Sequence, residues 1–297
     1  MNEVAAFPDL FIVPIDFSNA SLNASYTALE LGAKLKARIK LIHAYNLPDV
    51  RPMSFDDTDF YVGTLSTHIA EIKEEADKSM SVFLEKVNSY IKAKALSEIP
   101  VITSVINGIP DEITLYTAES ENAGLIVMGV SGKEIRTFEP MGKIASRIVE
   151  KSLVPVLVIP EDIEFKGLEN FKNVLYTTAF DESDFSAIGK LISIVKWLDM
   201  DIYCLHIGNE EKDQWNKLKM EGLHEYFNKV YGKTNVECDL IFSKDIIKAL
   251  DEFITSKNID LISLTTHKRN IISKLINPSI AKKILYHTRI PLLVFHG

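Results

Sequence analysis

The chain carries one order of structural elements twice, and this internal duplication limits the fold more than any other feature of the sequence. Three pairs of residues are related by one constant shift of 136 positions, namely Pro155 and Pro291, Ile144 and Ile280, and Met128 and Leu264. A length of 297 residues is also enough for two domains of roughly 150 residues each. The sequence therefore predicts two tandem copies of one domain.

Short apolar runs alternate with stretches of helical periodicity in both halves. The expected strands cover residues 10–15, 39–44, 100–106, 125–129, 154–159, 173–178, 201–207, 236–242 and 260–264, with a last strand from Pro291. The expected helices cover residues 21–38, 111–123, 183–198, 211–231 and 246–257, with a further helix from about Met141. This alternation predicts an α/β protein of two tandem doubly wound, five-stranded parallel-sheet domains with Rossmann-like topology.

Prolines and charged residues mark the connections. Residues 45–63 contain Pro48 and Pro52 and are expected to form a long loop before an amphipathic helix whose buried stripe runs from Ile69 to Tyr90. Residues 163–172 are charged, contain Gly167 and are expected to link the copies. The expected domains are therefore residues 1–162 and 173–297.

Composition excludes several classes of protein. The formal net charge of −8 and the pI near 5.5 leave no basic field for nucleic-acid binding. No apolar run approaches the roughly 20 residues that cross a bilayer, and the N-terminus lacks the pattern of a secretory signal. We expect a cytoplasmic protein in which Cys204 and Cys238 are buried thiols, with a disulfide between them as the less favoured alternative.

Three glycines follow the fourth expected strand. Gly129 and Gly132 allow a tight turn with close approach of the backbone to a ligand, and Gly142 precedes Lys143 and Ile144 at an expected helix N-terminus. Ligands of open parallel sheets bind at the carboxyl ends of strands, so this helix end predicts a phosphate site. Asp16, at the end of the first strand, could accept hydrogen bonds from a ribose hydroxyl or an adenine amino group; the alternative is that it caps the following helix.

Familiar nucleotide and hydrolase motifs do not fit this spacing. A Walker A loop ending at Lys143 would need glycine at Thr137 and a hydroxyl residue at Ile144. A dinucleotide fingerprint follows the first strand and not the fourth. A nucleophile elbow around Ser131 lacks its final glycine, because Lys133 stands there.

The spacing of Gly129, Gly132 and Gly142, with two and nine residues between them, resembles the universal stress protein family, whose fold is adenine nucleotide alpha hydrolase-like. The sequence Val13 to Ser18 resembles the family's first strand and its Asp, and the resemblance covers nearly the whole chain as two copies. It implies ATP or another adenine nucleotide, with or without magnesium, in the first domain. The implied binding residues are Pro14, Asp16, Ala44, Gly129, Gly132, Gly142, Lys143 and Ile144. Lys143 replaces the family's Ser or Thr, although an ammonium can also bind phosphate.

The second half departs from this pattern. Ala179 stands where Asp16 stands in the first half, and the positions of the three glycines hold Thr265, Lys268 and Pro278, with Ser279 remaining of the family type. Bulky side chains replace glycine, and Pro278 offers no amide to an anion. We expect no nucleotide there and read this half as a structural partner.

The two halves also share a histidine at matching strand positions, His43 and His206. A strand histidine that bonds a neighbouring backbone group is the expected reading, and neither histidine is given a catalytic role.

These observations favour a non-enzymatic stress-response protein that binds ATP in its first domain and acts as a nucleotide-linked regulator. The alternatives are a nucleotide-free scaffold in which both sites are degenerate and a slow ATP hydrolase, although no committed base or metal ligand stands out for hydrolysis. The family resemblance implies that the two copies pair through their last strands as an intramolecular pseudo-dimer. A homodimer remains open, and no nucleic-acid or membrane partner is expected.

Overall fold

The computed structural model describes residues 9–46, 58–96, 98–130, 142–161, 167–198, 200–208, 214–231, 236–266 and 290–296. Gly132, Lys268, Pro278 and Ser279, which the sequence singled out, lie outside these ranges. Among the described helices, none is both long and apolar enough to cross a membrane.

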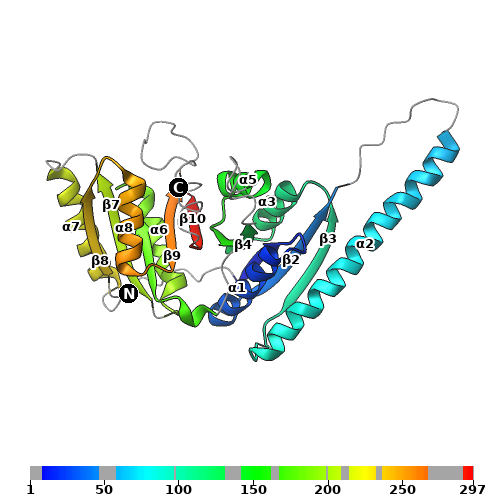
Figure 1. Ribbon diagram of the computed structural model, residues 1–297, viewed down its shortest axis with the longest axis horizontal. Coiled ribbons are helices and arrows are strands. Elements are labelled where there is room, and N and C mark those ends of the chain that lie inside the picture. The colour runs from blue at the N-terminus through cyan, green and yellow to red at the C-terminus, as the bar shows by residue number, and fades with distance from the viewer. Residues whose placement is uncertain are drawn as a thin grey trace.

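The described strands form one ten-stranded sheet in the order β3-β2-β1-β4-β5-β10-β9-β6-β7-β8 (Figure 1). The first-half strands are β1 (Leu10–Pro14), β2 (Arg38–Tyr45), β3 (Val101–Asn107), β4 (Leu125–Val130) and β5 (Val156–Pro160). The second-half strands are β6 (Asn173–Thr177), β7 (Asp201–Gly208), β8 (Val236–Phe242), β9 (Leu261–Thr266) and β10 (Leu292–His296). All pairs within a half are parallel, which confirms the predicted α/β class and the two five-stranded halves.

Helices cover both faces of this sheet. The described helices are α1 (Asn19–Leu35), α2 (Thr58–Ala93), α3 (Pro110–Ser120), α5 (Lys143–Lys151), α6 (Glu182–Val195), α7 (Gln214–Tyr231), α8 (Ile246–Lys257) and the short 3-10 turn η2 (Leu168–Asn170). Apolar residues of α1, α2, α6 and α7 pack in one core cluster, and those of α3, α5 and α8 pack in a second. Strands buried on both faces require continuous apolar runs, as in Leu10–Pro14 and Val156–Pro160.

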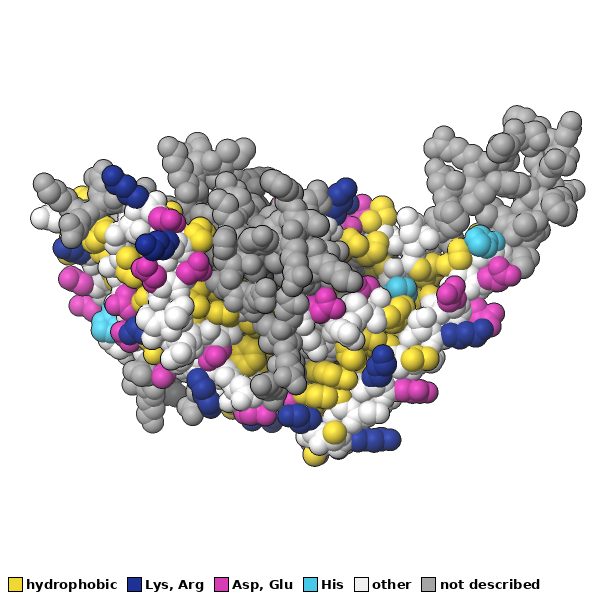
Figure 2. All heavy atoms as spheres, in the orientation of Figure 1, with side chains coloured by type: hydrophobic (Ala, Val, Ile, Leu, Met, Phe, Trp, Pro, Cys, Tyr) yellow, Lys and Arg dark blue, Asp and Glu magenta, His cyan; other side chains and the backbone are white. Residues whose placement is uncertain are grey.

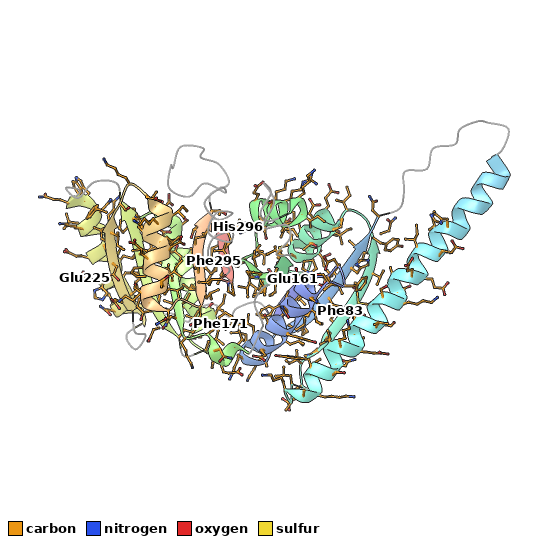
Figure 3. The ribbon with its side chains drawn as sticks, viewed as in Figure 1. Phe83, Glu161, Phe171, Glu225, Phe295 and His296 are labelled. Atoms are coloured by element: carbon orange, nitrogen blue, oxygen red, sulfur yellow. The ribbon has the colours of Figure 1, made fainter. Side chains whose placement is uncertain are left out.

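Antiparallel pairing of β5 with β10 joins the two halves. Leu292 lies opposite Val158, Leu293 opposite Leu157, and Val294 opposite Val156, and each of these side chains is at most 5% exposed. Figure 3 shows Phe295 and His296 at the end of β10, beside the first half. The two copies therefore form a pseudo-dimer within one chain.

The duplication extends to the bounds of the strands. β4 and β9 begin and end 136 positions apart, as do β5 and β10, whereas β1 and β6 are related by a shift of 163 positions. The predicted strands agree with the observed ones within two residues at each end. An apolar run of five to eight residues between turn signals is enough to locate a buried strand.

Helix α2 begins earlier than the sequence predicted. It starts at Thr58 and continues for 36 residues, so Gly63 lies inside the helix and the expected loop does not reach residue 63. Pro48 and Pro52 are the last prolines before α2, and a single glycine costs a helix only about 1 kcal/mol, which a long amphipathic helix tolerates. Figure 2 shows basic and acidic side chains interspersed along the described outer surface of α2.

The two cysteines lie opposite each other on β7 and β8 as free thiols. Cys204 is buried and Cys238 is half-buried, so the disulfide alternative does not describe this structure. A hydrogen bond with Cys238, together with burial, raises the pKa of the Cys204 thiol well above its ordinary value.

A buried carboxylate fixes the connection between the halves. Glu30 on α1 is 8% exposed and accepts hydrogen bonds from the Leu168 amide at 2.6 Å and from the Tyr90 hydroxyl at 2.5 Å. Lys94 lies 3.5 Å from both Glu30 and Glu169. Burial and the neighbouring Glu30 carboxylate raise the pKa of Tyr90. Glu30 on α1 therefore contacts both the C-terminal part of α2 and the segment that leads into the second half.

We expect Glu30→Ala to lower the free energy of unfolding by about 3 kcal/mol, because it leaves the Leu168 amide and the Tyr90 hydroxyl without their shared acceptor. Urea unfolding monitored by circular dichroism measures this loss. Glu169→Ala is the matched control: its side chain is 64% exposed and bonds the same Lys94, so its loss should stay below about 1 kcal/mol. Equal losses in the two variants would contradict the role assigned to Glu30.

Candidate functional site

A pocket of about 480 Å³ opens at the carboxyl ends of β1, β2 and β4. Seven of the eight residues that the sequence proposed line this pocket, and they are Pro14, Asp16, Ala44, Gly129, Gly142, Lys143 and Ile144. The eighth, Gly132, lies outside the described residues. Residues more than 120 positions apart in the sequence thus meet at one end of the sheet, where parallel strands direct their connecting loops.

The turn after β1 shapes one wall of the pocket. Asp16 is exposed and accepts hydrogen bonds from the amide of Ser18 at 3.0 Å and from its hydroxyl at 2.5 Å. Ser18, and not Asp16, is the N-cap of α1, since its side chain accepts from the Ser21 amide at 3.2 Å. The alternative that Asp16 caps α1 is therefore wrong. Asp16 instead orients Ser18, the capping residue, through two hydrogen bonds, and Asp16 also lines the pocket.

A histidine and a phenylalanine hold this turn in place. Phe17 has a positive φ of 65°, and its ring lies 4.3 Å from the ring of His43, whose Nδ1 is 2.9 Å from the carbonyl oxygen of Ile15. The second half repeats the arrangement with Phe180 and His206, at 4.2 Å between ring centroids. The Nδ1 of His206 lies 2.8 Å from the Thr178 carbonyl. The prediction that these histidines bond neighbouring backbone groups is confirmed.

Gly129 is required by helix packing as well as by the pocket. A Cβ atom at this position would lie 2.2 Å from the carbonyl carbon of Ala20 and 2.7 Å from the amide nitrogen of Ser21. These are backbone atoms in the first turn of α1, so they cannot move aside without moving the helix. The sequence analysis explained the glycine at this position by the close approach of a ligand. The structure shows that the backbone of α1 also approaches β4 closely at Gly129.

The first turn of α5 forms the opposite wall. Gly142 is its N-cap with φ +62°, a conformation that favours glycine, and Lys143 begins the helix. The backbone amides at the N-terminus of α5, which has nine residues, carry the positive end of the helix dipole. Lys143 and Ile144 are exposed at the pocket, while Ala145 is buried. This wall offers amides and an ammonium group to an anion.

A second ion pair lies next to the pocket. Asp111 on α3 is 2% exposed, and its carboxylate lies 3.5 Å from the guanidinium of Arg147, one turn beyond Lys143 on α5. This pair fixes α5 against α3, whose first residue, Pro110, lines the pocket. Among the described residues, no group of three or more His, Cys, Asp or Glu side chains could hold a metal ion.

In the described part of the second half, side chains form a hydrogen-bonded network at positions that match part of the first-half pocket wall. Tyr176, which matches Val13, is fully buried and donates a hydrogen bond to Asp184 at 2.6 Å. The Tyr176 hydroxyl also lies 2.8 Å from the hydroxyl of Thr265, which stands in the position of Gly129. Thr178 donates to the other carboxylate oxygen of Asp184 at 2.6 Å. Burial and Asp184 raise the pKa of Tyr176, so this phenol stays a neutral hydrogen-bond donor.

Sequence reasoning missed part of the pocket lining. The missed residues are Ile15, Ser21, Met128, Pro110 and Ala145, and His43 was noted without being placed there. Ser21, Met128 and Ala145 lie within a few residues of predicted positions, so the pattern already marked their neighbourhood. Pro110 follows β3, and the signal that could have found it is the general one that every parallel strand ends at this edge.

The chain resembles proteins of known family in sequence and in fold. A model of the universal stress protein family matches residues 10–160 and 170–296. A universal stress protein of Methanocaldococcus jannaschii is 24% identical over 151 residues, which cover 50% of this chain and 79% of that protein.

Solved structures share the whole architecture. A universal stress protein from Archaeoglobus fulgidus superposes with a TM-score of 0.71 at 17% identity, covering 97% of this chain and 98% of the other. A Pseudomonas aeruginosa protein of unassigned function superposes with a TM-score of 0.60 at 12% identity, covering 100% and 95%. At these identities the likeness concerns the fold. Because the family model covers both halves, from β1 to β5 and again from η2 to β10, the chain belongs to the universal stress protein family as a tandem of two domains.

Proposed function

We propose that the first domain binds ATP or another adenine nucleotide and that the protein is a cytoplasmic, nucleotide-linked regulator rather than a catalyst. The observation that carries the proposal is the pairing, across one pocket of about 480 Å³, of an exposed carboxylate with a helix N-terminus that bears a lysine. Pockets of this size are typical of small-molecule sites. The proposed domains are residues 1–162 and 173–297, joined by residues 163–172.

The residues suggest which part of the nucleotide each wall would hold. The amides at the start of α5 and the Lys143 ammonium suit phosphate oxygens, because both are positive and unhindered by a side chain at Gly142. Asp16, Pro14 and Ala44 lie on the opposite wall, where a carboxylate suits ribose hydroxyls or an adenine amino group. Gly129 contributes by keeping α1 close to β4.

The residues of the pocket favour binding over hydrolysis. Phosphoryl transfer needs an oriented water and stabilisation of charge on the transferred group. Among the described residues that line the pocket, Lys143 is the one cation, and His43 already bonds the Ile15 carbonyl. The hydrolase alternative would be revived by saturable phosphate release that Lys143→Ala abolishes.

The second domain is proposed to act as a structural partner of the first. The buried network of Tyr176, Asp184 and Thr265 occupies the place that corresponds to the first-domain pocket wall. On β10, the His296 Nε2 lies 2.7 Å from the carbonyl oxygen of Val149, in the last turn of α5. Carbonyls at a helix C-terminus lack partners within the helix, so the second domain caps the far end of the helix whose near end lines the pocket.

We expect Mg-ATP to bind with a stoichiometry near one per chain, and Lys143→Ala to raise the Kd about tenfold, because a hydrogen-bonded charge contributes roughly 1.4 kcal/mol. Calorimetric titration measures both values. Lys151→Ala, at the other end of α5, removes the same charge away from the pocket and should leave the Kd within about twofold. No binding of adenine nucleotides at millimolar concentration by the folded protein would leave the nucleotide-free scaffold as the function.

We expect His296→Ala to speed amide hydrogen exchange in α5 about fivefold and His296→Gln to restore most of the protection, since one hydrogen bond contributes about 1 kcal/mol and glutamine keeps a donor. Hydrogen-exchange mass spectrometry of the full chain gives this readout. His224→Ala, on the exposed surface of α7, is the matched control and should leave α5 unchanged. Unchanged exchange in His296→Ala would show that β10 does not stabilise α5 through this side chain.

A further inference from the structure

A second cleft, of about 380 Å³, lies between the two domains at the amino ends of the strands, which is the edge opposite the nucleotide pocket. Several of its residues lie shortly before strands: Lys172 directly precedes β6, Leu198 lies just before β7, Leu96 lies between α2 and β3, and Lys34 lies in the last turn of α1 before β2. Both domains contribute side chains, so the cleft exists because β5 and β10 are joined. No residue of the proposed nucleotide site lines it.

The interior of this cleft is mostly apolar. Leu168 is 5% exposed and forms part of the core, while Leu96 and Leu198 pack against that core from either side. Ala33 leaves space on the surface of α1. A cavity with an apolar interior and a few charged groups at its walls is the usual form of a small-molecule site.

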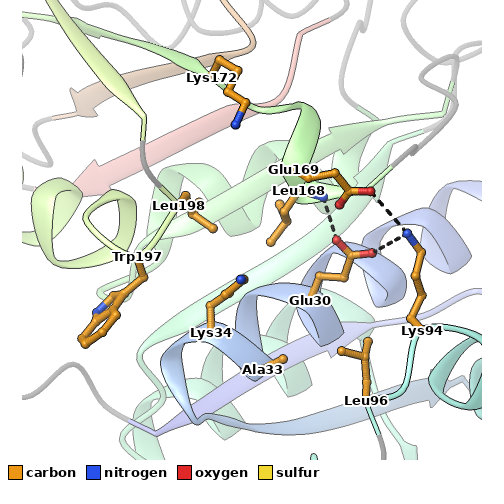
Figure 4. Close-up of a pocket in the computed structure, with 10 residues that line it drawn as sticks. All are labelled: Glu30, Ala33, Lys34, Lys94, Leu96, Leu168, Glu169, Lys172, Trp197 and Leu198. Atoms are coloured by element: carbon orange, nitrogen blue, oxygen red, sulfur yellow. Dashed lines mark hydrogen bonds and ion pairs between the residues drawn. The ribbon is translucent and has the colours of Figure 1, made fainter.

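The cations of the cleft differ in their surroundings. Lys94 is neutralised by Glu30 and Glu169, each at 3.5 Å. Figure 4 shows Lys34, on α1, and Lys172, at the end of the connecting segment, on opposite sides of the cleft, with Leu168 and Leu198 between their ammonium groups. Both lysines are exposed, and in the part of the chain that the structure describes neither ammonium has a hydrogen bond or an ion pair. A backbone hydrogen bond, Lys94 and, more weakly, Lys172 lower the pKa of the Glu169 carboxyl. Three lysines face two glutamates here, in a chain whose net charge is −8.

An aromatic side chain stands at the rim. Trp197 is 57% exposed although it follows directly on α6, and the Lys196 ammonium lies 5.2 Å from the centroid of its ring. Tryptophan presents a broad flat surface for stacking with an aromatic ring. Two exposed ammonium groups that form no ion pair with any described residue, an apolar interior and an indole at the rim are together complementary to one class of ligand.

We infer that this interdomain cleft, called here the lysine cleft, binds a small planar aromatic anion, such as an aromatic carboxylate, sulfonate or phosphate ester. The ring would lie on the apolar interior formed by Leu168 and Leu198, with Trp197 at the rim, and the anionic group would be attracted by the ammonium groups of Lys34 and Lys172 on either side of these leucines. The inference is independent of nucleotide binding, since the two sites share no residue.

The test uses the full chain carrying Trp215→Phe, which leaves Trp197 as the sole tryptophan of the two in the sequence. Nitroaromatic rings quench indole fluorescence, so 4-nitrobenzoate is the probe and neutral 4-nitrobenzamide is its isostere. We expect saturable quenching by the anion, with the amide binding about tenfold more weakly because it lacks the charge. N-acetyltryptophanamide corrects for light absorbed by the probes.

Lys34→Ala and Lys172→Ala should each weaken the binding of 4-nitrobenzoate about fivefold. Lys190→Ala is the matched control, because it removes an exposed lysine of α6 that does not line the cleft, and Lys143→Ala tests the separate pocket. Both controls should bind the probe as the parent does. Quenching that rises linearly without saturation, equal affinity for the amide, or unchanged binding in both cleft variants would overturn the inference.

Discussion

Antiparallel pairing between β5 and β10 is the contact on which the whole molecule depends. Each half ends in an apolar strand that would otherwise be an exposed edge, and an unpaired edge of this kind invites aggregation. Pairing the two last strands removes both edges and places the helices of each half on the same two faces. The lysine cleft and the contact between His296 and α5 both depend on this join, whereas the pocket at the carboxyl ends of β1, β2 and β4 is lined by first-half residues.

The two halves differ at the position of Gly129, beside the first-half pocket. At Gly129 the backbone of α1 comes so close to β4 that a Cβ has no room, and the carboxyl end of β1 stays open. At the matching Thr265 a side chain is present, and its hydroxyl joins Tyr176 and Asp184 in a buried network. The networks that order the turn survive in both halves, because Phe17 with His43 and Phe180 with His206 have nearly the same geometry. The turn that follows β1 therefore has nearly the same ring packing as the turn that follows β6, although Gly129 of the first half is replaced by Thr265 in the second.

Periodicity in the sequence was sufficient for the fold, because buried parallel strands need continuous apolar runs. For the pocket, the glycine spacing and the carboxyl ends of the strands indicated the edge of the sheet, and the family resemblance supplied the set of residues. Periodicity placed the start of α2 too late, since the local cost of Gly63 is small against the packing of a 36-residue helix. The sequence did not predict that Gly129 also makes room for α1, because a single strand pattern does not reveal which helix lies above it. The lysine cleft was out of reach for a related reason: Lys34, Lys172 and Trp197 belong to no motif and meet only when two domains are placed side by side.

Covalent connection of the two copies has a consequence for how they can change. In a symmetric dimer of one gene product, every substitution appears at both sites at once, so a threonine that closes one pocket closes the other. Here Gly129 and Thr265 are two different positions of one chain, so a substitution in one copy leaves the other copy unchanged. One copy can therefore specialise as a scaffold while the other retains an open pocket.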